Sequence, residues 1–371
     1  MTAAWFETHE RKATLAILLT ALALRLYMVF LSGLPHLGSD GLTYIDMGDA
    51  ILDGKPVSFF SNGYPILLAA LAHLMGEADP QPAWLLMNVL MSTGIVAFVL
   101  LLARRWLEPA FTLAAGAVVA VWPTQLYYTA QFLSDIPATF FLTFGIHLAL
   151  RRQPAAAGFV LGIATLIRDS LLPSVLLFAA VGMFDPERRR DMARLLLAVG
   201  IVQVLEWILE ARGVTAPPST AGLNLLLAVT SMSTEGIPAA PPGLSPEQMA
   251  HPWATYFRFA LEHPGTFILQ RLASLYELWG PWPNAGAPGS PRDTLVRLVI
   301  GLRFPLLVLA LGGLWAGRRH LESWMVAAPL LGLTAVHIAF FSASPRFTIP
   351  MEPAAIVLAA CAAQRLVRPA R

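Results

Sequence analysis

Long apolar runs recur through most of this chain, and they constrain its fold more than any other feature. A helix that crosses a bilayer needs roughly 20 apolar residues, or somewhat fewer when it packs inside a bundle. The sequence is 56% hydrophobic and only 13% charged, about half of the roughly 25% charged residues of a soluble domain. It therefore predicts an all-α polytopic membrane protein with about ten transmembrane helices. The spans are expected near residues 13–33, 83–103, 109–127, 135–150, 155–169, 171–184, 194–210, 295–316, 323–342 and 348–364.

Basic residues in the short loops predict the orientation, because loops on the cytoplasmic side carry an excess of Lys and Arg. With about ten crossings, every basic cluster lies inside the cell if residues 64–76 do not cross. This stretch is too short to span comfortably, so we expect a juxtamembrane helix in the outer interface. The clusters are Arg11-Lys12, Arg104-Arg105, Arg151-Arg152, Arg188-Arg189-Arg190, Arg318-Arg319 and the tail from Arg365 onward.

This orientation places both termini in the cytoplasm and divides the chain into three regions. Residues 1–210 form an N-terminal membrane module whose first outer loop is 34–82, residues 211–294 form a second outer region, and residues 295–371 form the C-terminal membrane helices. The abundance of Ala, Pro and Arg hints at a bacterial protein of the inner (plasma) membrane. The net charge of +2, with arginines in short clusters, gives no basis for binding nucleic acid.

Acidic residues collect in the first outer loop of a chain that is otherwise poor in charge. Asp40 follows the first span, and Asp46, Asp49 and Asp53 lie in a short amphipathic helix that is expected to end at Gly54. A carboxylate beside a membrane must be solvated or paired, so such residues are candidates for function. Asp40 is either a base held at the edge of the bilayer or a simple cap for the helix that follows it.

A second acid, Asp135, starts a later span on the same side. Ser134 or Asp135 could simply cap that helix, with Pro137 in its first turn. Asp40 and Asp135 could also divide base and orienting roles, or share a divalent metal such as Mg²⁺ or Mn²⁺. Their spacing does not establish that they meet, and whether any metal cofactor is used stays open.

Three arginines are predicted at the same outer face: Arg25 late in the first span, Arg168 at a helix end and Arg346 in the last outer turn. A guanidinium group suits phosphate oxygens. The alternative is an ion pair with a nearby acid, such as Arg168 with Asp169, or Arg25 with an aspartate of the outer loop. Lys55, the one lysine outside, either meets a phosphate or is a solvated loop residue.

Other polar residues favour structural roles. Glu206 and Glu210 are four residues apart on one helix face, and Arg212 could pair with either. His147 and His337 lie within apolar spans, where an isolated histidine is more often hydrogen-bonded within the bundle than a ligand. The sequence contains no HExxH, GxSxG or Walker pattern and no Cys/His metal spacing.

Several short motifs occur in an order that resembles a known family. They are Ser39-Asp40 with Tyr44 and Asp49-Ala50, Gly63-Tyr64-Pro65-Ile66-Leu67-Leu68-Ala69, Leu133-Ser134-Asp135, Gly162-Ile163-Ala164-Thr165-Leu166-Ile167-Arg168, Glu262-His263-Pro264-Gly265 with Arg271 and Trp279-Gly280, and Arg346-Phe347-Thr348-Ile349-Pro350-Met351-Glu352-Pro353. This ordered set is similar to the GT-C glycosyltransferases, especially the branch with the protein O-mannosyltransferases and the lipid A aminoarabinose transferase.

The resemblance implies an inverting transferase embedded in the membrane. Such an enzyme takes a sugar from a polyprenyl-phosphate carrier on the outer face and gives it to a lipid, glycan or protein acceptor. By the same resemblance, Asp40 acts as general base or orients the acceptor, with Asp135 assisting. Arg168 and Arg346 occupy positions that bind donor phosphate.

Tyr44, Asp49 and Tyr64 lie within these motifs and are expected in the substrate pocket. The chain also departs from the family, since Gly41 follows Asp40 where longer relatives have a second acid, so the sugar and the acceptor stay open. The alternatives are a lipid-linked sugar transporter or flippase, and another polysaccharide-modifying membrane protein. A transporter would need polar residues along a path through the bundle, whereas the acids here collect at one face.

Overall fold

The computed structural model describes residues 3–33, 38–57, 59–76, 79–218, 224–228, 245–280, 299, 301–340 and 344–367. Every regular element within these ranges is a helix, as the composition predicts. The elements are α1 (Ala3–Phe30), α2 (Ser39–Leu52), α3 (Gly63–Met75), α4 (Gln81–Ala103), α5 (Pro109–Val121), α6 (Pro123–Thr129), α7 (Asp135–Leu150), α8 (Pro154–Ile167), η1 (Asp169–Leu171), α9 (Leu172–Gly182), α10 (Arg189–Ala211), α12 (Pro246–Ala250), α13 (Pro252–Glu262), α14 (Pro264–Trp279), α16 (Arg303–Ala316), α17 (Leu321–Phe340), η2 (Pro345–Met351) and α18 (Glu352–Val367).

Five of the described helices are long and apolar enough to cross a membrane, namely α1 from His9 onward, α4, α10, α17, and η2 with α18. A sixth span forms if α5 and α6, which meet at a bend of 46°, are counted together. The other predicted spans coincide with shorter apolar helices, α7, α8, η1 with α9, and α16. The chain is therefore an integral membrane protein that spans the bilayer several times, while the count of ten stays a prediction. Part of the predicted span 295–316 lies outside the described residues.

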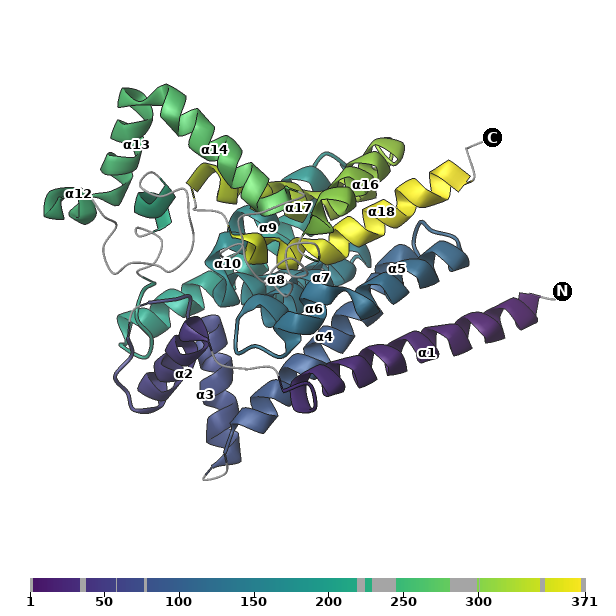
Figure 1. Cartoon of the computed structure of the whole chain (residues 1–371), viewed down its shortest axis with the longest axis horizontal. Coiled ribbons are helices and arrows are strands. Elements are labelled where there is room, and N and C mark those ends of the chain that lie inside the picture. The colour runs from purple at the N-terminus through teal and green to yellow at the C-terminus, as the bar shows by residue number, and fades with distance from the viewer. Residues whose placement is uncertain are drawn as a thin grey trace.

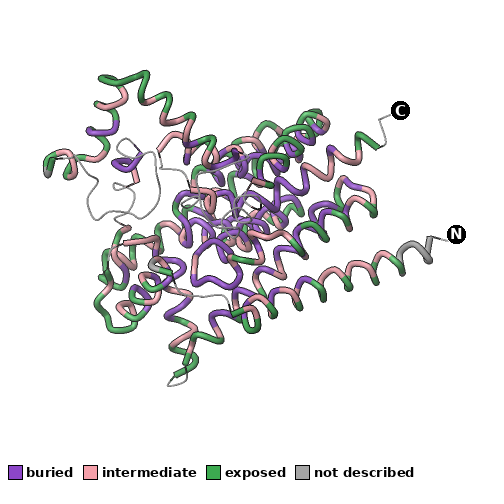
Figure 2. The backbone as a smooth tube through the Cα atoms, viewed as in Figure 1, coloured by how far each residue is buried: buried purple, intermediate pink, exposed green. Residues whose placement is uncertain are grey.

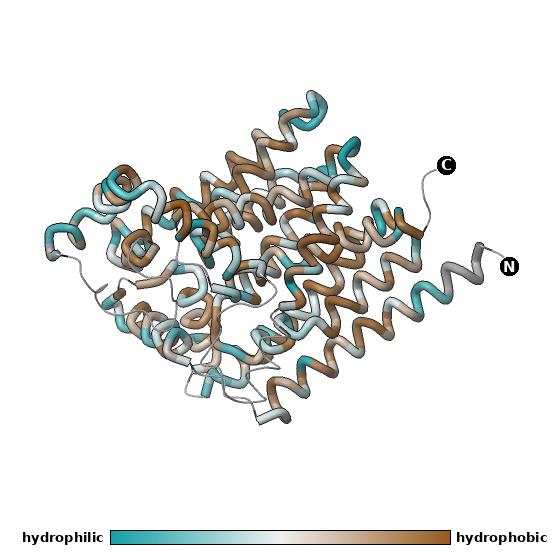
Figure 3. The backbone as a smooth tube through the Cα atoms, turned by 45° about the horizontal axis from the view of Figure 1, so that its top comes forward, coloured by the Kyte–Doolittle hydropathy of each residue, from teal (hydrophilic) through white to brown (hydrophobic). Residues whose placement is uncertain are grey.

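The long helices run side by side, with both chain ends at one end of the bundle (Figure 1). At the opposite end lie α2 and α3, together with α12 and α13 (Figure 1). Buried residues concentrate in the middle of the bundle, whereas α1 at its edge is largely exposed (Figure 2). Hydrophobic residues follow the helices, and many hydrophilic ones gather at the turns between them (Figure 3). Helices α2 and α3, from the predicted first outer loop, thus share one end of the bundle with α12 and α13, from the predicted second outer region.

The basic loop clusters meet at the end that carries the chain termini. Glu322, at the start of α17, pairs with Arg105 at 3.1 Å and also with Arg188. Arg104 pairs with Glu10 of α1 at 3.0 Å. These contacts join four segments that the loop-charge pattern predicts on one side of the membrane.

Arg25 supports the break between α5 and α6. Pro123 starts α6 and has no N–H, so the carbonyl of Val119 loses its α-helical donor and accepts instead from the Trp122 N–H at 3.3 Å. The fully buried Arg25 donates to the carbonyls of Ala120 at 3.0 Å and Val119 at 3.4 Å, and its Nε donates to Ser92 at 2.6 Å. An unsatisfied carbonyl inside a bilayer is costly. Arg25 therefore donates to backbone carbonyls at the helix break and, within the described residues, does not pair with an aspartate of the first loop, so we do not propose it for binding phosphate.

Candidate functional site

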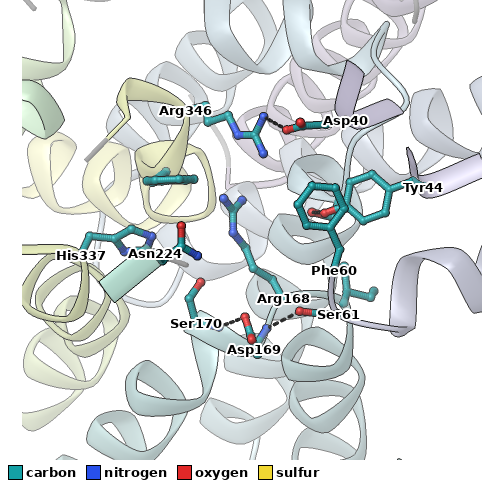
Figure 4. A pocket seen from close by; sticks show the side chains of 13 residues that line it. Asp40, Tyr44, Phe60, Ser61, Arg168, Asp169, Ser170, Asn224, His337 and Arg346 are labelled. Carbon is teal, nitrogen blue, oxygen red and sulfur yellow. Dashed lines mark hydrogen bonds and ion pairs between the residues drawn. The ribbon is translucent and has the colours of Figure 1, made fainter. Parts of the chain in front are cut away.

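A cavity of about 90 Å³ opens at the end of the bundle that carries α2 and α3 (Figure 4). Its walls come from segments far apart in the sequence, including α2, the turn before α7, the end of α8, α17 and η2. The lining residues are Asp40, Tyr44, Phe60, Ser61, Ser134, Ile167, Arg168, Asp169, Ser170, Asn224, His337, Arg346 and Phe347. The sequence-predicted Asp40, Tyr44, Arg168 and Arg346 are therefore brought together.

Two arginine–carboxylate pairs form the charged centre of this cavity. Arg346 Nη1 lies 2.5 Å from Asp40 Oδ2, and these side chains are 25% and 24% exposed. Arg168 Nη1 lies 2.5 Å from Asp135 Oδ1, and these side chains are only 9% and 1% exposed. Asp135 thus lies beneath the wall and holds Arg168 in place, whereas Asp40 reaches the open space.

The two arginines face the same space. In Figure 4 the guanidinium groups of Arg168 and Arg346 both point toward the centre of the cavity. Arg168 pairs with Asp135. It does not pair with the neighbouring Asp169, the partner that the sequence offered as an alternative to phosphate. Asp169 instead accepts a hydrogen bond from the backbone N–H of Ser170 at 2.8 Å. Two arginines beside one cavity can hold a phosphate group through charge-assisted hydrogen bonds.

Phe347 and His337 form a wall that sequence reasoning did not assign to the site. The guanidinium carbon of Arg168 lies 5.2 Å from the centroid of the Phe347 ring, and that of Arg346 lies 5.7 Å from it. The His337 ring lies 4.6 Å from Phe347, and its Nδ1 is 2.8 Å from the Leu333 carbonyl. His337 is hydrogen-bonded within the bundle, as predicted. Its place on the wall follows from the packing of α17, for which the sequence carries no signal.

Tyr44 closes the side formed by α2. Its hydroxyl shares a hydrogen bond of 3.0 Å with Ser134, and its ring stacks on Phe60 with centroids 4.6 Å apart. Burial raises the pKa of Tyr44 to about 12, although the Ser134 hydrogen bond and the positive charges of Arg346 and Arg168 act in the opposite direction. Tyr44 is therefore a neutral, ordered wall residue at physiological pH.

The remaining predicted pocket residues lie outside the lining. Tyr64 is fully buried and packs edge-on against Tyr44, with centroids 5.1 Å apart, so it supports the wall from behind. Asp49 and Lys55 are exposed to solvent and do not line the cavity. Partial burial and the neighbouring carboxylates raise the pKa of Asp49. The structure thus gives Asp49 and Lys55 no contact with the charged centre.

A buried polar network holds η2, the element that carries Arg346. Arg303 is fully buried and donates to the Pro345 carbonyl at 2.6 Å. At the other end of η2, the fully buried Glu352 accepts hydrogen bonds from Thr124 at 2.7 Å and from Gln125 at 2.9 Å. Because both ends of η2 are tied to neighbouring segments, the position of Arg346 is set by residues that do not line the cavity.

The start of α3 is docked closely against the end of α8, just before Arg168. A Cβ atom added at Gly63 would lie 2.5 Å from the backbone N of Ile167, so only glycine allows this approach. Next to it, Asn62 donates to the Ala216 carbonyl at 3.0 Å and lies 3.4 Å from Glu206. Glu206 and Glu210 therefore contact Asn62, and no ion pair joins either of them to Arg212 within the described residues.

The acids do not form a site that fits a divalent metal. Asp40 and Asp135 were the candidate ligands, and each lies against an arginine. The buried Asp135 Oδ2 has no hydrogen-bond partner within the described ranges. However, those ranges contain no group of three or more His, Cys, Asp or Glu that could hold a metal ion. Mg²⁺ demands near-octahedral oxygen ligation, which the arginine-paired Asp40 and Asp135 do not offer.

The fold is similar to those of solved archaeal oligosaccharyltransferases and of ArnT. The apo oligosaccharyltransferase of Archaeoglobus fulgidus matches with a TM-score of 0.56 and 15% identity, over 94% of this chain and 50% of that one. The oligosaccharyltransferase AglB of the same organism, in complex with an inhibitory peptide and a dolichol-phosphate, matches with a TM-score of 0.50, 15% identity and coverage of 96% and 52%. ArnT from Cupriavidus metallidurans, bound to undecaprenyl phosphate, matches with a TM-score of 0.53 and 16% identity, over 100% of this chain and 61% of that one.

The likeness concerns the fold, because the identities are near 15% and the chain spans only about half to three fifths of these proteins. No protein-family model and no curated protein sequence matches the chain. A fold does not define an activity, which depends on the site it carries; here that site is the cavity lined by Asp40, Arg168 and Arg346, the Asp40 cavity.

Proposed function

We propose that this protein is a membrane glycosyltransferase that moves a sugar from a polyprenyl-phosphate donor to a lipid, glycan or protein acceptor in the Asp40 cavity. The observation that carries the proposal is the convergence of two arginines and two aspartates, from separate segments, at one end of a membrane bundle. The bound undecaprenyl phosphate and dolichol-phosphate of the ArnT and AglB structures support the choice of donor class. In this proposal the cavity faces the periplasm and both termini are cytoplasmic.

The proposed reaction is a single displacement at the anomeric carbon of the sugar. An acceptor hydroxyl oxygen attacks this carbon from the face opposite the phosphate. The bond from the carbon to the phosphate oxygen breaks, and the phosphate leaves with the electron pair. The hydroxyl proton passes to an aspartate oxygen, which acts as general base. One displacement inverts the anomeric centre, so no sugar becomes bonded to the protein.

In this proposal the four charged residues have different roles. Arg168 and Arg346 would hold the phosphate and stabilise the charge that develops on it as the bond breaks. Asp40 is the better base, because it is partly exposed and lines the cavity, while Asp135 is buried behind Arg168. In the structure, the carboxylate of Asp40 is ion-paired with Arg346. A donor phosphate that draws Arg346 toward itself would release an oxygen of Asp40 for the acceptor proton.

A transfer assay with a matched pair of variants tests the proposal. Asp40→Asn removes the base with little change in shape, and Asp46→Asn makes the same change at an exposed position of α2 that does not line the cavity. Purified protein in nanodiscs receives a panel of radiolabelled polyprenyl-phosphate sugars, and label is followed into lipid, glycan and protein acceptors. We expect Asp40→Asn to slow transfer by at least about 100-fold, and Asp46→Asn to leave the rate unchanged.

Two results would contradict the proposal. Equal rates for the Asp40→Asn variant and the unmodified protein would remove Asp40 from the role of base. No consumption of any donor by folded protein would instead favour a lipid-linked sugar transporter, which should then move labelled donor between the leaflets. The anomeric configuration of the product, read by NMR, tests inversion separately.

A further inference from the structure

A second cavity, of about 360 Å³, lies at the end of the bundle that carries the chain termini. It forms where the loop after α4, the turn between α16 and α17 and the last turns of α18 meet. Its polar lining includes Arg105, His320 and Arg365, and its less polar lining includes Trp106 and Cys361. None of these residues belongs to the Asp40 cavity, which lies at the other end of the molecule.

Arg365, at the rim of this second cavity, has no carboxylate partner among the described residues. Glu322 pairs with Arg105 and Arg188, and Arg188 pairs in turn with Asp185 at 3.4 Å, so these four groups balance. Arg365 is exposed at the cavity. The guanidinium of Arg365 is therefore available to an anion that enters the cavity.

We propose that this cavity binds the phosphate of an anionic phospholipid headgroup. An arginine at its rim suits phosphate oxygens. Trp106 donates from its indole to Glu322 at 2.9 Å, which orders an aromatic residue of the type that membrane–water interfaces favour. Basic pockets between helices near the cytoplasmic surface are a known setting for anionic headgroups. Free phosphate carries the same chemistry, so the test separates the two sources.

Cys361 provides the readout. It is the only cysteine of the chain, it lines the second cavity and it is half-buried. A bound headgroup should therefore slow its modification by a small maleimide. The rate is measured in nanodiscs of phosphatidylcholine alone, in nanodiscs with increasing phosphatidylglycerol, and in phosphatidylcholine nanodiscs with inorganic phosphate. We expect protection by phosphatidylglycerol and none by inorganic phosphate.

Two variants connect the protection to the arginine. Arg365→Gln should raise the fraction of phosphatidylglycerol needed for half-protection about tenfold, the loss of one charge-assisted contact. Arg190→Gln removes the same charge from an exposed position next to the start of α10, outside the cavity, and should leave the protection unchanged. Unfolding of both variants in neutral nanodiscs should match that of the unmodified protein, because both side chains are exposed.

Three outcomes would overturn the inference. Cys361 modification that does not respond to phosphatidylglycerol would mean that no headgroup enters the second cavity. Equal protection in the Arg365→Gln and Arg190→Gln variants would mean that the effect is general to the charged membrane. Protection by inorganic phosphate alone would assign the site to a free anion and reject the lipid.

Discussion

The buried ion pair of Asp135 and Arg168 leads to a prediction about the free energy of unfolding, which can be tested without an assay for sugar transfer. Asp135 is 1% exposed and its partner 9% exposed, with 2.5 Å between Oδ1 and Nη1. Arg168→Gln leaves a carboxylate buried without its counter-charge. Removing one member of a buried pair costs about 3–5 kcal/mol of unfolding free energy. We expect Asp135→Asn alone to cost a similar amount, because it strands the guanidinium.

The double variant Asp135→Asn/Arg168→Gln is expected to behave differently from the sum of the two. With both charges gone, the two amides can hydrogen-bond to each other, and the cost should fall to about 1–2 kcal/mol. The difference from additivity is the coupling energy of the pair. Unfolding of the four proteins by sodium dodecyl sulfate in mixed micelles, followed by circular dichroism, measures all four free energies.

Strict additivity would refute this reasoning. If the double variant lost the sum of the single losses, the charges would act independently, and Asp135 would not be holding Arg168. The double variant has a second use, because it should fold well and yet fail to transfer sugar. A folded and fully active double variant would remove Arg168 from the phosphate site.

Three further predictions follow from other contacts. Gly63→Ala should cost about 1–3 kcal/mol of unfolding free energy because its Cβ would meet the backbone at the end of α8. As a control, Gly200→Ala should be neutral or stabilising in the same sodium dodecyl sulfate unfolding experiment, because nothing lies within 4 Å of the added Cβ. Arg25→Met should cost about 1–3 kcal/mol of unfolding free energy because the Ala120 carbonyl, beside the break between α5 and α6, loses its Arg25 donor. An unchanged unfolding midpoint would contradict this. The pKa of Tyr44 is raised by burial to about 12, above the ordinary value of about 10. Folded Tyr44 therefore keeps its proton while the unfolded chain releases it, so stability should be intact below about pH 10 and fall between about pH 10 and 12. Tyr44→Phe should lessen that fall, and identical pH curves for the two proteins would rule it out.

Much of the fold could be predicted from the sequence, because a run of apolar residues indicates a segment that lies in lipid, whatever the rest of the chain does. The run from His9 to Phe30 and the one from Gln81 to Ala103 each form a single long helix. The thirteen-residue run at Gly63–Met75 forms a short helix, as its length predicts. Short runs such as 135–150 also form helices, but their length alone does not decide whether they cross the membrane.

The candidate site could be predicted only in part. The sequence singled out Asp40, Asp135, Arg168 and Arg346 because a charge beside a membrane is costly unless it is used or paired. It could not pair them, since 306 residues separate Arg346 from Asp40. The pairing depends on how α2, α7, α8 and η2 pack. In this packing Arg168 pairs with Asp135, and not with Asp169, which was the alternative partner that the sequence offered.

The amino-acid sequence by itself determined the helices, the membrane setting and the sorting of charge to the ends of the bundle, because these depend on local hydrophobicity and on the charges of short loops. The tertiary structure alone decided which charges meet. It placed Arg25 against broken backbone inside the bundle, left Lys55 and Asp49 in solvent, and brought His337 to the wall of the Asp40 cavity. Such contacts join residues distant in the chain, and their geometry is set by the close packing of many helices at once.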